Sequence, residues 1–341
     1  KIVYYKRFGS DLQKNNIEEI TSTEYKYRIG SISKMFTAVM IFQLIDENKL
    51  SLNDKLSVYF PEMPNAKVIT IDNLLNHHSG LYSFTNDSNY LTWCVNHKSK
   101  EEMLRIMKDE KPVFNPDEKC GYSNTNYVLL GYIIEAITGN TFEKELNERI
   151  VKKIGLKNTY YGSKINAENN EVKSYEFKNN NWSESQETDM SIPGGAGSVV
   201  STPADMTCFI EALLDGKLIS QNSLEIMKTV KGKYGRGIFV SNKEGIVSYG
   251  HSGAIDEFRS DLYNYPDLNL TIAITFNGIN YVRQKVTNTI VKIAKGERVD
   301  LNTFNILKLS EEQMSQYEGV YSSKEIPIII KIKKESNQLI A

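Results

Sequence analysis

The chain has 341 residues, with 41 Lys and Arg against 42 Asp and Glu and a formal net charge of −1 at pH 7. This length allows one large domain or two modest ones, and the balanced charge gives no basic excess that would favour nucleic acid or an anionic membrane surface as a partner. Its three cysteines and four histidines show neither a C-x-x-C pair nor a zinc-binding spacing, so we expect no disulfide framework, no metal and no cofactor.

Short runs of apolar and polar residues fill the first 29 positions and predict short antiparallel strands over Ile2–Tyr5, Asn16–Ile20 and Tyr25–Arg28. Lys1 begins directly in such a run, which we interpret as a start inside a longer precursor. The lack of a leader at residue 1 therefore says little about export.

The segment Ile29–Ile45 is almost continuously apolar after Gly30. It predicts a helix over residues 31–47 that is buried on every side. The run is shorter than the about 20 apolar residues that span a bilayer, so we expect a core helix and no transmembrane segment.

Helical patterns dominate residues 50–214. Thr70 is expected to cap one helix, Tyr127–Thr138 forms another that ends at Gly139, and Pro203 begins a third that runs to Leu214. Between them, residues 157–190 are polar, and Asn179–Asn181 predict an exposed hairpin. We favour a solvated surface excursion there over a functional role.

Strand patterns return from Gly235, and a helix is expected over Val282–Ala294. With strands at both ends and helices between them, the simplest assembly is an α+β fold. Its antiparallel sheet is built from N- and C-terminal segments, is flanked by helices and carries an inserted, mainly helical lobe over about residues 50–214. A cleft between the two lobes is where a site is expected. The strands predicted from Gly235 onward are Gly237–Val240, Ile246–Tyr249, Glu257–Tyr263 and Leu270–Phe276.

We assign residues 1–300 to this domain and residues 301–341 to a linker and appended strands. Glu318–Tyr321 and Ile326–Lys333 have strand patterns, but about 30 residues are too few for an independent core. The segment is either an appended hairpin or the opening of a truncated small β domain.

Ser31 and Lys34 form a Ser-x-x-Lys pair at the start of the apolar helix. Residues three apart share a helix face, and burying a lysine is costly unless something uses it. A buried lysine loses part of its preference for the charged form, so it can take the serine proton and make the hydroxyl a nucleophile. The alternative is that Ser31 only caps the helix and Lys34 extends to solvent.

The loop Cys120–Asn124 is a second candidate element. Tyr122 could take the Ser31 proton if nearby cations lower its pKa from the reference value of about 10. Asn124 could hold Lys34 and a substrate amide by hydrogen bonds. The alternative is a turn with a partly buried tyrosine.

Gly250–Ala254, between two predicted strands, is the third element. Small residues there would let a substrate backbone lie close and pair as an added strand. The N–H groups of Ala254 and Ser31 could then form an oxyanion hole. The alternative is a hairpin with a surface histidine at His251.

In this order, Ser-x-x-Lys, Tyr-x-Asn and His-x-Gly resemble the motifs of the serine β-lactamase and penicillin-binding-protein superfamily, most of all its class C β-lactamase and D-alanyl-D-alanine carboxypeptidase branch. Leu74–Leu81 is similar to that family's Leu-Leu-x-His-x-Ser-Gly-Leu segment. Gly194–Ser198, leading into Ser201–Asp205, is similar to its glycine-rich stretch. The resemblance covers five segments in the right order and implies the family's β-lactamase/transpeptidase-like fold.

The resemblance also implies a role for each matching residue. Ser31 would be the acylated nucleophile, Lys34 its proton partner, and Tyr122 the general base and then the acid for the leaving group. The remaining implied roles concern the substrate: Asn124 would bind its amide, His251, Ser252 and Gly253 would line its strand, and the N–H groups of Ser31 and Ala254 would form the oxyanion hole.

Two departures from the family pattern bear on the substrate. His251 stands where many members have a lysine, and histidine is not always cationic at neutral pH, which weakens the case for binding a carboxylate and for β-lactam hydrolysis. If His251 acts as a cation, activity on carboxylate substrates should fall as the pH rises through about 6.5. Glu257 stands where the family tends to have a small residue, and we favour a solvent-facing side chain over one that binds a substrate amine.

The leading hypothesis is therefore a serine hydrolase that acts through an acyl-enzyme on a D-amino-acid peptide, an ester or a β-lactam-like amide. The alternatives are a catalytically silent penicillin-binding-like module that recognises cell-wall peptides, and an esterase with no cell-wall role. The expected partner is a small-molecule or peptide substrate, not nucleic acid, and the oligomeric state is open. Family resemblance implies an exported protein.

Overall fold

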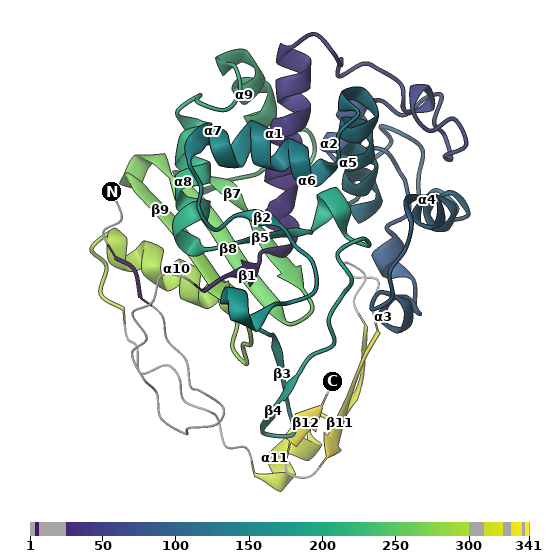
Figure 1. Ribbon diagram of the computed structural model, residues 1–341. Helices are drawn as coiled ribbons and strands as arrows, with labels where there is room; N and C mark the ends of the chain where they lie inside the picture. The colour runs from purple at the N-terminus through teal and green to yellow at the C-terminus, as the bar shows by residue number, and fades with distance from the viewer. Residues whose placement is uncertain (1–3, 7–24, 300–309, 323–328, 336–337, 341) are drawn as a thin grey trace. The chain divides into compact units, whose positions relative to one another are not determined.

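The computed structural model describes residues 4–6, 25–299, 310–322, 329–335 and 338–340 (Figure 1). The chain divides into two compact units, Lys1–Lys295 and Gly296–Ala341. Of the strands predicted near the N-terminus, Asn16–Ile20 lies wholly outside the described residues. Ile2–Tyr5 lies half outside them, and its described residues Tyr4 and Tyr5 are not in a strand.

The first unit has a helical middle and a strand-rich end, as the predicted α+β class requires. Its helices are α1 (Ser33–Asp46), α2 (Ile71–Leu75), α3 (Tyr90–Trp93), α4 (Lys100–Lys108), α5 (Asn124–Thr138), α6 (Phe142–Leu146), α7 (Lys152–Ile154), α8 (Pro203–Leu214), α9 (Gln221–Lys228) and α10 (Arg283–Ala294). Its strands are β1 (Tyr27–Arg28), β2 (Tyr160–Tyr161), β3 (Tyr175–Lys178), β4 (Asn181–Glu184), β5 (Val199–Ser201), β6 (Phe239–Lys243), β7 (Ile246–Ile255), β8 (Phe258–Tyr265) and β9 (Leu270–Phe276).

The largest sheet is antiparallel, in the order β6-β7-β8-β9. One face carries Asp261, whose carboxylate accepts a hydrogen bond of 2.7 Å from Thr287 on α10. Leu262, the next residue of β8, points to the other face and belongs to the main hydrophobic core, with α8 packed against β8 and β9 on that side. A smaller sheet, in the order β1-β5-β2, brings the described N-terminal strand beside Val199–Ser201.

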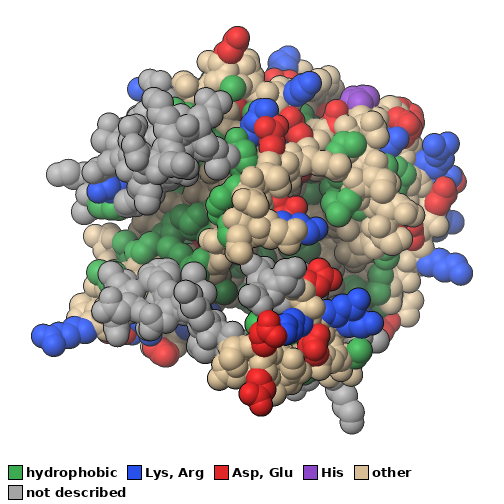
Figure 2. Space-filling view, turned by 90° about the horizontal axis from the view of Figure 1, so that it is seen from below, with side chains coloured by type: hydrophobic (Ala, Val, Ile, Leu, Met, Phe, Trp, Pro, Cys, Tyr) green, Lys and Arg blue, Asp and Glu red, His purple; other side chains and the backbone are tan. Residues whose placement is uncertain are grey.

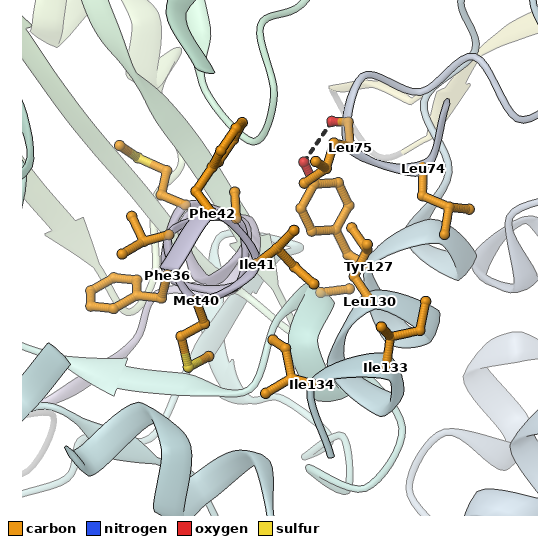
Figure 3. Close-up of a cluster of buried hydrophobic side chains, with 14 of the residues drawn as sticks. Phe36, Met40, Ile41, Phe42, Leu74, Leu75, Tyr127, Leu130, Ile133 and Ile134 are labelled. Carbon is orange, nitrogen blue, oxygen red and sulfur yellow. Dashed lines mark hydrogen bonds between the residues drawn. The ribbon is translucent and has the colours of Figure 1, made fainter. Parts of the chain in front are cut away.

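Helix α1 runs through the centre of the core, as predicted. All twelve residues from Ser33 to Leu44 are buried. Figure 3 looks along the helix, and the labelled side chains of Phe36, Met40, Ile41 and Phe42 leave it in different directions. A helix packed on every side cannot shift without breaking contacts, so it is a rigid support for residues in its first turn.

Helix α5 packs beside α1 and ties it to α2. The buried Tyr127 hydroxyl donates a 2.7 Å hydrogen bond to the Leu75 carbonyl, drawn as the dashed line in Figure 3. Other predicted signals also hold: Thr70 forms a capping box with Asn73, and Gly139 ends α5 with a left-handed φ of 69°.

The second unit contains α11 (Glu311–Ser315) and an antiparallel sheet of β10 (Gly319–Ser322), β11 (Ile329–Glu335) and β12 (Gln338–Ile340). Within the described part of the chain, no helix is long and apolar enough to cross a membrane. On the face shown in Figure 2, acidic and basic side chains lie interspersed and are not gathered by sign.

Candidate active site

Ser31 lies in a 3₁₀ turn, Gly30–Ile32, that precedes α1. Gly30 makes the turn possible, because its φ of +51° disfavours other residues and a Cβ there would lie 2.8 Å from the backbone N, C and O atoms of Ala254. The turn therefore presses directly against β7. Ser31 does not cap the helix, since no side-chain cap hydrogen bond is formed at the start of α1.

Lys34 is fully buried in the first turn of α1, and its amine meets three oxygens. Nζ lies 2.9 Å from Ser31 Oγ, 2.8 Å from Asn124 Oδ1 and 2.8 Å from the Ala196 carbonyl oxygen. The Asn124 amide is oriented by its own Nδ2, which donates to Thr85 Oγ1 at 2.9 Å, so its oxygen must face the lysine.

This set of three oxygen partners can accommodate an ammonium with three N–H donors or a neutral amine with two. The neutral form is the one that can act as a base. The Asn124 and Ala196 oxygens can only accept, so they take two N–H bonds of Lys34. The remaining nitrogen position faces Ser31 Oγ, where a lone pair can receive the serine proton. Burial lowers the pKa of Lys34 well below its ordinary value of 10.5, which agrees with that state.

Tyr122 is the third predicted catalytic residue, and the structure places it beside Lys34. The Lys34 Nζ lies 5.0 Å from the centre of the Tyr122 ring. Burial raises the pKa of Tyr122, and its hydrogen bond with Ser31 only partly opposes that shift. The predicted condition, a pKa of Tyr122 lowered by nearby cations, is therefore not met, because desolvation outweighs the effects that lower it.

His251 lies inside the protein, so the alternative of a surface histidine is wrong, and the condition that it acts as a cation finds no support. The ring is 2% exposed and stacks on Phe239 with centroids 3.9 Å apart. Desolvation, with a smaller contribution from Lys34, lowers the pKa of His251 to about 3. The imidazole is therefore neutral across the physiological range and offers no positive charge to a substrate carboxylate.

Ser252 and Gly253 have structural roles in the packing of the sheet. Ser252 lies on the face of β7 opposite His251, and its hydroxyl interacts with Tyr263. A Cβ at Gly253 would lie 2.0 Å from the Ile29 carbonyl oxygen, so the glycine lets β7 approach the turn that carries Ser31. Neither residue lines the cavity that contains Ser31.

That cavity has a volume of about 660 Å³ and is lined by Ser31, Asn124 and Ala254 among others. One part of its wall is largely apolar and is formed by Phe84, Tyr90, Leu91 and Pro193. Another part is charged and is formed by Glu176, Glu184, Asp256, Glu257 and Arg259.

The residues that line this cavity contradict two predictions about the surroundings of the site. The hairpin β3–β4 was expected to be only a solvated excursion, yet its residues Glu176 and Glu184 line the cavity. Glu257 was expected to face solvent, but its side chain is 32% exposed, lines the same cavity and pairs with Arg259 at 3.1 Å. Tertiary contacts bring these residues to the site.

Sequence reasoning also missed three supporting groups. The Ala196 carbonyl and the Thr85 hydroxyl orient Lys34 and Asn124. Ala196 lies in the family-like stretch Gly194–Ser198, whereas Thr85 has no local pattern of its own. His77, whose ring centroid lies 4.4 Å from that of Tyr122, could have been singled out because it lies in the family-like segment Leu74–Leu81. Among the described residues, no group of three or more His, Cys, Asp or Glu is placed to hold a metal ion.

Comparison with known proteins agrees with this architecture. Residues 1–293 match the family model described as Beta-lactamase. PbpX of Bacillus subtilis (strain 168) is 30% identical over 301 residues, which cover 87% of this chain and 73% of PbpX. The teichoic acid D-alanine hydrolase of Staphylococcus aureus (strain MRSA252) is 25% identical over 243 residues, which cover 71% of this chain but only 55% of that protein.

A solved structure of a D-stereospecific amidohydrolase from Streptomyces sp. is similar with a TM-score of 0.68 and 28% sequence identity. The match covers 75% of this chain and 83% of the Streptomyces chain. The likeness confirms the predicted β-lactamase/transpeptidase-like α+β fold.

Proposed function

We propose that this chain, which belongs to the β-lactamase family of serine hydrolases, acts through an acyl-enzyme formed on Ser31. The observation that carries the proposal is the buried Lys34 amine, 2.9 Å from Ser31 Oγ, with its other two partners able only to accept. An amine held in this way is a base for the one hydroxyl beside it.

Acylation starts as Ser31 Oγ attacks the substrate carbonyl carbon and its proton passes to Lys34 Nζ. The carbonyl electron pair moves to the oxygen and gives a tetrahedral oxyanion. When this collapses, the bond to the leaving group breaks, and Tyr122 donates its phenol proton to that group. Lys34 then returns a proton to Tyr122, so both side chains regain their starting states. Water cleaves the acyl-enzyme through the same proton transfers in reverse.

This sequence assigns the base to Lys34 and the acid to Tyr122, because burial shifts their pKa values in opposite directions. The pKa of the amine is lowered and that of the phenol is raised. Each shift is therefore in the direction that its step requires.

The oxyanion hole would be formed by the N–H groups of Ser31 and Ala254. Ile255 pairs with Phe258 at the two-residue turn between β7 and β8, and Ala254 pairs with Arg259 just before it. Hydrogen-bonded and non-hydrogen-bonded pairs alternate along an antiparallel ladder. If the closing pair is hydrogen-bonded, the Ala254 N–H points away from β8. Strand β6 pairs only as far as Gly250, so this edge of β7 is free for a substrate.

For the substrate, we propose an amide or ester of a D-amino acid with an apolar side chain. The names of two relatives, a D-stereospecific amidohydrolase and a teichoic acid D-alanine hydrolase, support the D configuration. The apolar wall and the carboxylates of the cavity favour a substrate that is partly apolar and neutral or cationic. Because His251 is neutral, it offers no positive charge to pair with the carboxylate of a β-lactam, so we expect weak β-lactam turnover at most.

A panel of chromogenic substrates tests this function. It contains the D- and L-phenylalanine para-nitroanilides, a short-chain para-nitrophenyl ester and a chromogenic cephalosporin, each assayed with the wild type and Ser31→Ala. We expect turnover of the D-anilide above the L-anilide, dependent on Ser31. Labelling of Ser31 by a fluorophosphonate without any turnover would favour the silent module, and turnover of the ester alone would favour the simple esterase.

A further inference from the structure

His77 lies directly behind Tyr122, in the segment that follows α2. The residue is 2% exposed and has a left-handed φ of 61°. A non-glycine residue in that conformation is uncommon, although Asn, Asp and His adopt it more readily than others. The conformation turns both the backbone carbonyl and the ring of His77 toward the loop that carries Tyr122.

The two residues that flank Tyr122 are both bound to His77. The Gly121 N–H donates to the His77 carbonyl oxygen at 2.9 Å. The Ser123 N–H donates to His77 Nδ1 at 3.2 Å. Between these two bonds, the imidazole faces the phenol ring, with centroids 4.4 Å apart and planes at 32°.

A second contact fixes which nitrogen accepts. Ser79 Oγ donates to Asn126 Oδ1 at 2.7 Å, which directs the Asn126 amide nitrogen toward His77 Nδ1, 3.3 Å away. Nδ1 therefore faces two N–H donors and must carry a lone pair, which leaves the ring proton on Nε2. Burial lowers the pKa of His77, so the ring stays neutral and Nδ1 stays an acceptor.

We propose that His77 is a positioning residue for acyl transfer, holding Tyr122 in place through the hydrogen bonds to Gly121 and Ser123. This inference rests on the proposed function, because it gives His77 the task of orienting the acid for the leaving group. Loss of the Nδ1 acceptor would leave the Ser123 N–H unpaired and free the loop beside Ser31. A displacement of about 1 Å at a reacting group can cost on the order of 100-fold in rate.

Two variants distinguish loss of the hydrogen-bond acceptor at residue 77 from loss of the left-handed backbone conformation. His77→Asn tolerates a positive φ and places Oδ1 near the position of Nδ1, so it keeps the bond to Ser123. His77→Gly tolerates the same φ but has no side chain to accept that bond. His77→Gln replaces His77→Gly if the glycine variant does not fold, because its amide oxygen lies one carbon further out.

We expect His77→Gly to lower kcat about 10- to 100-fold with KM within about twofold, and His77→Asn to stay within about threefold of the wild type in both. Hydrogen exchange of the peptide that covers residues 119–125 should accelerate in His77→Gly and not in His77→Asn. Equal losses of kcat in the two variants, or unchanged kcat in His77→Gly, would overturn the inference. So would equal exchange in all three proteins.

The exchange measurement also separates this inference from the proposed function. If the wild type shows no Ser31-dependent turnover, the proposed function fails. In that case, slow exchange that depends on the acceptor would still show that His77 holds the loop, and the catalytic part of the inference would fall with the function.

Discussion

The inner cluster of the site, formed by Ser31, Lys34, Tyr122 and Asn124, contrasts with the outer rim formed by Glu176, Glu184, Glu257 and Arg259. Lys34 is fully buried, whereas the Glu184 side chain is 52% exposed. Charges meet little screening in the inner cluster, while water and salt weaken every interaction at the rim. Under the proposed function, the rate of the reaction would therefore depend mainly on the inner cluster, and the choice of substrate on the outer rim.

The largest effect is expected from Lys34→Ala. Loss of the base should lower the rate of Ser31 acylation by about two or more orders of magnitude, measured with a fluorophosphonate in a stopped-flow or quench experiment. Lys152→Ala, at a lysine that is 62% exposed, is the matched control and should react at the wild-type rate. Near-normal acylation of Lys34→Ala would show that Lys34 is not the base for Ser31 and would contradict the role given to the inner cluster.

The core around α1 and the β3–β4 hairpin at the rim should also differ in how much a substitution lowers the free energy of unfolding. Phe36 on α1 is fully buried and stacks on Phe209 with centroids 3.7 Å apart. Phe36→Ala should lower the free energy of unfolding by about 3–5 kcal/mol, measured by urea denaturation. Phe177→Ala on the rim hairpin, where the side chain is 37% exposed, should cost about 1 kcal/mol or less. Similar costs at both positions would contradict the contrast.

The smallest effect is expected at the rim. Glu257→Gln should raise KM for a substrate with a free amine by up to about fivefold and leave kcat unchanged, because partly exposed charges contribute about 1 kcal/mol or less. The N-acetylated substrate should show no such change, and added salt should reduce the effect. A change in kcat at low and high salt alike would place Glu257 in the reaction itself.

The inner cluster could be predicted because its signals are local. The apolar run around Lys34 favours burial of its amine, and Ser31 lies three residues away. Gly121–Asn124 is a short polar loop ahead of a helix, so Tyr122 and Asn124 stood out as candidates. Fold class followed from the same kind of evidence, with helical periodicity in the middle and strand patterns at the end of the domain.

The other features of the site could not be predicted in this way, because they depend on contacts between segments that are distant in the sequence. The hairpin β3–β4 has the composition of a solvated loop, and only the folded chain places Glu176 and Glu184 at the cavity. The neutral state of His251 follows from burial against Phe239 on the neighbouring strand. Ala196 lies in the family-like stretch Gly194–Ser198, but the resemblance does not indicate that its backbone carbonyl contacts Lys34.

The most direct test of the account is the pH dependence of the Ser31 acylation rate. Acylation needs the neutral form of Lys34, and burial lowers the pKa of that amine well below 10.5. The rate should therefore rise with pH through the lowered pKa of Lys34 and reach a plateau well below pH 10.5, with no decline attributable to His251 between pH 5 and 8. A rate that keeps rising tenfold per pH unit up to about 10 would show an ordinary, charged lysine and contradict the account.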